Sequence, residues 1–139
     1  MALLYIDTNI YLDYFEGRVD NLRPLGEFAY QIFQRTLSCE FHIVISSHLL
    51  KELRFIEKDS KIEEFLEEFK EKNKIIFVAC SFEDKQFANL LSKQRKTPFA
   101  DTLHAVIAKR IGAEYLITRN IKDYTELQDV IRILLPEFL

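Results

Sequence analysis

The chain has 139 residues, of which 48% are hydrophobic and 29% are charged, and its formal net charge at pH 7 is -3. These proportions suit one domain with one core, and they exclude a protein that holds nucleic acid through bulk positive charge. No apolar run approaches the roughly 20 residues that a membrane-spanning helix requires, so we expect a soluble protein without membrane attachment.

Five short apolar runs predict strands. The first covers residues 3–6 and is continuously apolar, which is typical of a strand covered on both faces. The others lie at residues 42–45, 75–78, 115–117 and 130–134.

Helical spacing of apolar residues fills the segments between these strands. In chain order the predicted helices cover residues 9–16, 25–37, 47–72 with a break near Asp59 and Ser60, 83–93 and 98–111. Strands that alternate with helices indicate an α/β fold. We therefore predict that residues 1–139 form a single domain, a three-layer α/β/α sandwich with a mainly parallel sheet of about five strands.

Boundary residues support the later helices. Ser81 with Asp84 resembles a capping box, and Thr97 followed by Pro98 suits an N-cap and the first helical position. Gly112 suits the end of the last predicted helix.

Four carboxylates fall where a parallel sheet would bind a ligand, beyond the carboxyl ends of its strands. Asp7 directly follows the first strand, and Asp123 lies in the loop after the strand at 115–117. Asp101 lies in the first turn of the helix at 98–111, and Glu52 lies one and a half turns into the helix after the second strand. We expect these four side chains to gather at one edge.

Clustered carboxylates repel one another, and a bound cation is the simplest explanation for their joint ionisation. Oxygen ligands favour Mg²⁺ or Mn²⁺ over zinc. Such a site can activate a water and neutralise charge on a phosphodiester, so hydrolysis of a nucleic-acid backbone is the leading reaction class.

Three motifs resemble those of the PIN-domain family. They are Asp7-Thr8-Asn9 after the first strand, Phe99-Ala100-Asp101-Thr102-Leu103-His104-Ala105, and the segment from Ile117 to Tyr124 that contains Thr118-Arg119-Asn120. The motifs occur in the family's order and span almost the whole chain.

The resemblance implies a metal-dependent endoribonuclease that uses Mg²⁺ or Mn²⁺, as the VapC toxins of toxin-antitoxin pairs do. It implies an RNA substrate, a small antitoxin as partner and a homodimer. The residues that match the family's acidic positions, as catalytic residues and metal ligands, are Asp7, Glu52, Asp101 and Asp123. Thr8 and Asn9 match the polar residues that support the first aspartate, and Thr118 and Asn120 are further supporting residues.

Several alternatives stay open at this point. Asp7 can serve only as a helix cap, and Asp123 can serve only to cap a turn. Glu57 competes with Glu52 for the second acidic position. Some relatives carry an acid where this chain has Asn120, so Asp123 is our candidate for the fourth ligand. His104 lies one turn after Asp101 but is left out, because histidines in a hydrogen-bonded core are commoner.

Arg119 and Lys122 lie in the segment of Asp123, and we expect them to contact RNA phosphates. The alternative function is a catalytically inactive PIN-like scaffold that binds RNA or protein. A phosphoaspartyl phosphatase or receiver is disfavoured, because Asp7-Thr8-Asn9 lacks the D-x-D of the former and no acidic pair precedes Asp7.

The location that we expect is the cytoplasm. Cys39 and Cys80 are far apart and lack the C-x-x-C spacing of zinc or redox sites. The chain also reaches Asp7 before a signal-peptide core could form.

Overall fold

The sheet at the centre of the protein has five parallel strands in the order β3-β2-β1-β4-β5. A computed structural model describes residues 2–19, 22–38 and 40–139. The strands are β1 (Ala2–Ile6), β2 (Phe41–Ser46), β3 (Ile75–Val78), β4 (Tyr115–Ile117) and β5 (Ile133–Leu134). Every paired strand is parallel to its neighbour, as the alternation of strands and helices predicted.

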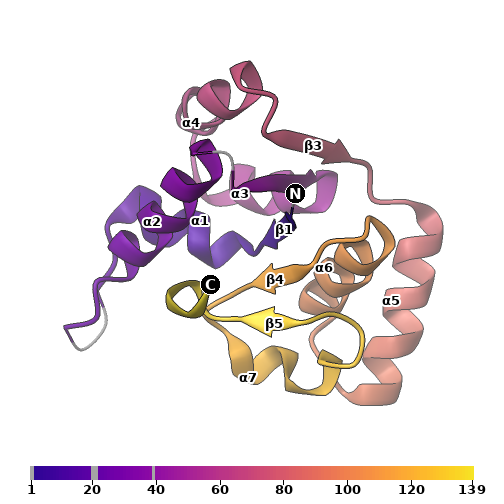
Figure 1. The fold of residues 1–139 in the computed structure, drawn as a ribbon. Coiled ribbons are helices and arrows are strands. Elements are labelled where there is room, and N and C mark those ends of the chain that lie inside the picture. Colours follow the sequence, from indigo (N-terminus) through magenta and orange to yellow (C-terminus); the bar gives the residue numbers. More distant parts are fainter. Residues whose placement is uncertain (1, 20–21, 39) are drawn as a thin grey trace.

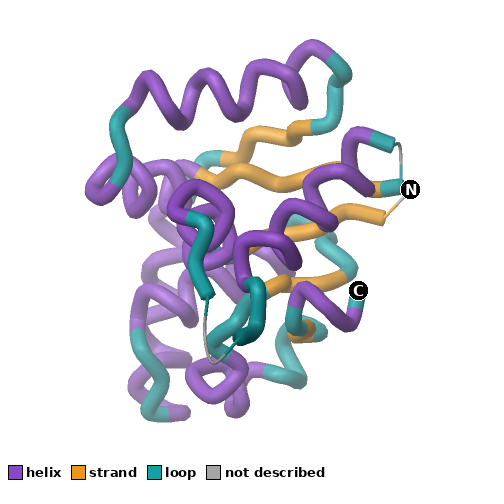
Figure 2. The backbone as a smooth tube through the Cα atoms, turned by 90° about the vertical axis from the view of Figure 1, so that its left-hand side faces the viewer, coloured by secondary structure: helices purple, strands orange, loops and turns teal. Residues whose placement is uncertain are grey.

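Helices cover both faces of this sheet (Figures 1 and 2). They are α1 (Thr8–Glu16), α2 (Leu25–Leu37), α3 (Ser47–Ile56), α4 (Asp59–Glu71), α5 (Phe82–Arg95), α6 (Phe99–Arg110) and α7 (Ile121–Tyr124), with short 3₁₀ turns at Thr125–Leu127 and Pro136–Phe138. The predicted three-layer α/β/α sandwich is confirmed. None of the described helices is long and apolar enough to cross a membrane.

The central strand supplies core side chains to both layers. Leu4 and Ile6 of β1 pack with residues of α1, α2, α3 and α4, whereas Tyr5 packs with residues of α5 and α6. Successive side chains of a strand point to opposite faces, so a strand buried on both faces must be apolar throughout. This requirement explains the continuous apolar run that predicted β1.

Two of the predicted helix boundaries are confirmed. Ser81 and Asp84 form a capping box at the start of α5. Gly112 follows α6 with φ at +79°, and the amides of Gly112 and Ala113 donate to the carbonyls of Lys109 and Ala108, which is a Schellman arrangement.

Other predicted boundaries are wrong by a few residues. Pro98, not Thr97, is the N-cap of α6, and the Thr97 hydroxyl instead contacts the Thr102 hydroxyl at 2.6 Å. The break in the segment 47–72 falls at Glu57 and Lys58, so Asp59 begins α4. The last strand is limited to Ile133–Leu134, because only these residues pair with β4.

Helices α1 and α2 meet closely at Gly26. A Cβ atom at this position would lie 2.9 Å from the Asp13 carbonyl oxygen and 3.0 Å from the Gly17 Cα, and backbone atoms cannot move aside as a flexible side chain can. We expect Gly26→Ala to lower the free energy of unfolding by about 1–3 kcal/mol. Urea denaturation measures this, with Glu27→Ala on the exposed face of α2 as the control; equal stability of the two variants would contradict the close packing.

Candidate active site

An open cavity of about 800 Å³ lies at the edge of the sheet where the strands β1 to β4 end. Residues that follow each of these strands line it, including Asp7 after β1, Ser47 after β2, Cys80 after β3 and Asn120 after β4. Helix α3 adds successive turns with His48, Lys51, Glu52, Phe55 and Ile56, and the start of α6 adds Phe99 and Asp101. The predicted location of a ligand site therefore coincides with a real cavity.

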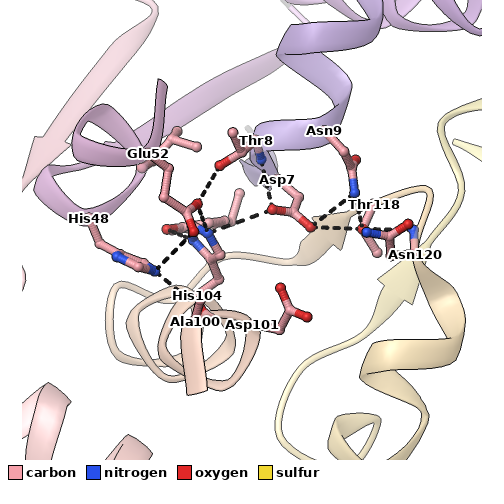
Figure 3. Close-up of polar contacts among 12 residues, drawn as sticks. Asp7, Thr8, Asn9, His48, Glu52, Ala100, Asp101, His104, Thr118 and Asn120 are labelled. Atoms are coloured by element: carbon pink, nitrogen blue, oxygen red, sulfur yellow. Dashed lines mark hydrogen bonds and ion pairs between the residues drawn. The ribbon is translucent and has the colours of Figure 1, made fainter. Parts of the chain in front are cut away.

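Asp7 is held by four hydrogen bonds and is nearly fully buried. Its Oδ1 accepts from the Thr8 amide at 2.7 Å, so it does cap α1. Its Oδ2 accepts from the Thr118 hydroxyl at 2.9 Å, the Tyr124 hydroxyl at 3.1 Å and the Asn9 amide at 3.3 Å. Capping uses only one oxygen. The other contacts come from Asn9 of α1, from Thr118 just after β4 and from Tyr124 of α7, and together they give this carboxylate a fixed orientation (Figure 3).

Glu52 lies beside Asp7, on the neighbouring helix α3. Its Oε1 accepts from the Thr8 hydroxyl at 2.5 Å and lies 2.6 Å from His104 Nε2. Burial raises the pKa of Glu52, but the hydrogen bond and the charge of His104, with the hydrogen bond of Thr8, outweigh burial and lower it to about 2. Glu57, the alternative, does not line the cavity and pairs with Lys61 at 3.7 Å.

Asp101 enters the same cavity from the first turn of α6. Burial, the nearby charge of Asp7 and the smaller contributions of Asp123 and Glu52 raise its pKa to about 6, although the charge of His104 acts in the opposite direction. Part of this shift comes from the neighbouring carboxylates, so negative charge is concentrated in the cavity.

Asp123, the fourth predicted acid, lies outside the cavity. Asp123 is exposed, belongs to the short helix α7 rather than to a loop, and is not among the residues that line the cavity. Asn120 lines the cavity instead, and its backbone amide donates to the Thr118 hydroxyl at 3.1 Å. The structure therefore gathers Asp7, Glu52 and Asp101, with Asp123 close enough for its charge to affect Asp101.

Comparison with known proteins identifies the family. A sequence model of the PIN domain matches residues 4–122, which is most of the chain. The chain belongs to the PIN-domain family. A search of curated protein sequences gives no significant match.

Solved structures share this PIN fold at low sequence identity. VapBC2 from Rickettsia felis, bound to a DNA fragment from its promoter, is 20% identical with a TM-score of 0.67 over 96% of this chain and 98% of that chain. A toxin-antitoxin complex from Klebsiella pneumoniae is 22% identical with a TM-score of 0.59 over 98% of both chains. VapC20 from Mycobacterium tuberculosis, a toxin that cleaves the sarcin-ricin loop, is 14% identical with a TM-score of 0.54 over 81% of this chain and 86% of that one.

The two cations predicted to contact substrate lie elsewhere in this PIN domain. The Arg119 guanidinium forms a bidentate ion pair with the buried Asp13. Its Nε donates to Oδ2 at 2.9 Å and its Nη2 donates to Oδ1 at 3.0 Å. Lys122 is exposed on α7 and does not line the cavity. The lysines that do line it are Lys51 and Lys85, from α3 and α5.

Sequence reasoning missed three side chains of the PIN site. His104 of α6 is fully buried and contacts Glu52, Tyr124 contacts Asp7, and His48 lies 3.8 Å from Glu52. With Glu52, the two histidines form a group whose potential ligand atoms lie within 4.8 Å of one another. The only signal for His48 was its spacing of one turn from Glu52, and Tyr124 had the pattern of an ordinary core aromatic.

The residues of this PIN site fit a hard divalent cation. Three carboxylates, those of Asp7, Glu52 and Asp101, line the same cavity and offer oxygen ligands. Burial raises the pKa of Asp101 most, and the charge of Asp7 adds to this shift, so a cation there would favour the ionised form. The nitrogens of the two histidines suit transition metals, but His48 Nε2 contacts the Ala100 carbonyl oxygen at 3.1 Å and both nitrogens of His104 have partners. The carboxylates are therefore the better candidates for ligands.

Proposed function

We propose that this PIN domain is a divalent-cation-dependent endoribonuclease and the toxin of a toxin-antitoxin pair. The observation that carries the proposal is the convergence of Asp7, Glu52 and Asp101 in one open cavity, together with the raised pKa of Asp101. Such a cluster of acids has little structural value by itself, because each added negative charge destabilises the others.

Asp7, Glu52 and Asp101 would hold Mg²⁺ or Mn²⁺, with Asp123 as an outer acid. When bound, the cation supplies charge neutralisation for the phosphodiester and acidifies the attacking water. Thr8, Asn9 and Thr118 orient the two innermost carboxylates through their hydrogen bonds. Lys51 and Lys85 would contact phosphates of the RNA beside the scissile bond, and no residue serves as a covalent nucleophile.

The proposed antitoxin partner rests on the apolar part of the cavity rim. Phe55 is 94% exposed, and Ile56 and Phe99 beside it are also exposed. Two of the structural neighbours are complexes of a toxin with its antitoxin. We propose that a small antitoxin covers these side chains, that the chain forms a homodimer, and that both act in the cytoplasm; light scattering with and without the co-expressed partner tests the assembly.

The test of the nuclease is cleavage of a mixed RNA pool in the presence of Mg²⁺ or Mn²⁺. We expect cleavage by the wild type, loss with EDTA, recovery when the cation is restored in excess, and no cleavage by Asp7→Asn purified in the same way. Asp7→Asn removes a ligand charge but keeps the size of the side chain. Equal cleavage by both proteins would reveal a contaminating nuclease and contradict the proposal.

A non-catalytic scaffold is the second candidate, because the cavity is lined by Asp7, Glu52 and Asp101 together with Asn120, and not, among the described residues, by a fourth acid. This candidate predicts cation binding that Asp7→Asn abolishes, without cleavage of any RNA in the pool. RNA binding that persists in EDTA would support it further.

A further inference from the structure

His104 connects the proposed cation site to a chain of buried polar groups. The side chain is fully buried, and both of its ring nitrogens have partners. Nε2 lies 2.6 Å from Glu52 Oε1, and Nδ1 lies 2.5 Å from the Tyr5 hydroxyl. Tyr5 in turn contacts the Ser46 hydroxyl at 2.7 Å, and Ser46 accepts from the Leu49 amide at 3.0 Å as the N-cap of α3.

Every link of this chain has a consistent donor and acceptor. An ionised carboxylate can only accept, so His104 Nε2 must carry the hydrogen that it shares with Glu52. With a neutral imidazole, Nδ1 accepts from the Tyr5 hydroxyl, Tyr5 accepts from the Ser46 hydroxyl, and Ser46 accepts from the Leu49 amide. With the charged imidazolium, Nδ1 instead donates to the Tyr5 oxygen and Tyr5 donates to the Ser46 oxygen, and the hydrogen of Nε2 still points to Glu52. Ser46, Tyr5 and His104 are all fully buried, so an unpaired group anywhere in the chain would be costly.

This series of hydrogen bonds ends at one particular oxygen of Glu52, Oε1. Oε1 takes both the His104 contact and the Thr8 hydroxyl hydrogen bond (Figure 3). Within the described residues Oε2 accepts no hydrogen bond, and His48 Nε2 lies 3.8 Å from it. Glu52 is partly exposed and its side chain has several rotatable bonds, so without these two donors it would sample many orientations.

His104 also lies between two carboxylates from different elements. Its Nε2 is 3.6 Å from Asp7 Oδ1, at the end of β1, as well as 2.6 Å from Glu52 Oε1 on α3. A positive N–H edge between two negative groups reduces their repulsion and keeps them at a set separation. The same helix carries Asp101 one turn before His104, so α6 supplies one of the three acids and contacts the other two through His104.

We propose that His104 is a positioning residue, which through the chain from Ser46 and Tyr5 holds the Glu52 carboxylate in the orientation that binds the cation. The inference rests on the proposed cation site but concerns residues outside it. It differs from the simpler view that His104 is a satisfied core histidine, because that view predicts an effect on folding and none on the affinity of the folded protein for a cation.

The experiment is a titration of the purified protein with Mn²⁺, followed by electron paramagnetic resonance. We expect His104→Leu, which keeps bulk but removes the N–H donor, to weaken Mn²⁺ binding by roughly tenfold to a hundredfold. His104→Gln keeps an amide donor that can reach Glu52, so its affinity should recover to within about threefold of the wild type. Circular dichroism and thermal denaturation show which variants are folded.

A double-variant cycle with Glu52→Gln separates positioning from general structure. If His104 acts through Glu52, adding His104→Leu to Glu52→Gln should weaken Mn²⁺ binding by much less than His104→Leu does alone. Full additivity of the two changes, or unchanged affinity in folded His104→Leu, would overturn the proposal.

Tyr5→Phe provides a test that does not alter the histidine itself. It removes the hydroxyl that orients His104, and we expect Mn²⁺ binding to weaken by severalfold. Tyr11→Phe is the matched control, because the Tyr11 hydroxyl is buried on the other side of the sheet without a partner among the described residues. Equal Mn²⁺ affinity in the two variants would contradict the proposal that the hydrogen bonds from Ser46 through Tyr5 to His104 position Glu52.

The wild type and Asp7→Asn are titrated first. If the wild type binds no Mn²⁺, or if Asp7→Asn binds it equally well, the cation site is rejected and the role of His104 falls with it. If Asp7→Asn loses binding but folded His104→Leu and Tyr5→Phe do not, only the positioning role is rejected.

Discussion

Asp101→Asn is expected to make the cation-free protein more stable than the wild type, and to lower cation-dependent cleavage by on the order of a hundredfold or more. Burial and the charge of Asp7 raise the pKa of Asp101 to about 6, so its ionised form destabilises the fold at neutral pH. The neutral amide removes this repulsion at nearly constant volume. The expected gain in the free energy of unfolding is about 1–2 kcal/mol, below the full value of the shift because Asp101 is partly exposed.

The pH dependence of this gain has a definite sign. The pKa of Asp101 is raised on folding from 3.8 to about 6, so the folded state binds more protons than the unfolded state between these values. Stability of the wild type in EDTA should therefore fall as the pH rises through this interval, and the advantage of Asp101→Asn should be largest above it. Thermal denaturation at several pH values in EDTA measures the stability of the wild type and of Asp101→Asn.

A control variant and added cation test whether the effect is specific to Asp101. Asp123→Asn at the exposed neighbouring acid should change stability far less, and its effect on cation affinity decides whether Asp123 is a ligand. Added Mg²⁺ or Mn²⁺ should stabilise the wild type and not Asp101→Asn. If Asp101→Asn is less stable than the wild type in EDTA, the repulsive cluster that we infer does not exist.

Arg119→Ala is expected to lower the free energy of unfolding by about 2–4 kcal/mol. Asp13 is almost fully buried and faces the Arg119 guanidinium through two hydrogen bonds, so the substitution leaves a buried charge without its main partner. Arg18, 3.7 Å from Asp13, keeps the loss below that of a fully isolated charge. Urea denaturation gives the value.

Lys122→Ala is the matched control, because Lys122 is an exposed cation three residues further on in the same segment. We expect a change within about 0.5 kcal/mol. In Arg119→Ala combined with Asp13→Asn, the loss should be smaller than the sum of the two single changes, since both remove the same pair. Unchanged stability of Arg119→Ala together with weaker RNA binding would restore the role of Arg119 as a substrate contact, which the sequence alone had suggested.

The local parts of the fold were predictable from sequence because their causes are local. The apolar run ending at Ile6 reports burial on both faces, and Ser81 with Asp84 contains both partners of a capping box within four residues. The positions of Asp7 and Asp101 were predictable for a related reason. Each lies next to the end of a strand or the start of a helix, and parallel strands all end at the same edge.

The positions of Glu52 and Asp123 relative to the cavity were harder to predict from the sequence. Both were placed only by counting along a helix or segment, and a shift of a few residues moves a side chain to another face. The orientation of α3 decides that Glu52, not Glu57, lines the cavity. The helical turn of α7 decides that Asn120 lines it and that Asp123 lies outside.

The sequence by itself therefore determined the strand and helix pattern, the parallel sheet and the edge where acids gather. Only the tertiary structure decided which polar groups serve the site: His104 meets Glu52 across 52 positions, Tyr124 meets Asp7 across 117, and Arg119 meets Asp13 across 106. A pattern of apolar residues is set by each element's own surroundings, whereas a hydrogen bond between two elements depends on how both are oriented in the folded chain. For that reason a core histidine and a positioning histidine look alike in sequence, and an arginine in an ion pair looks like a free one.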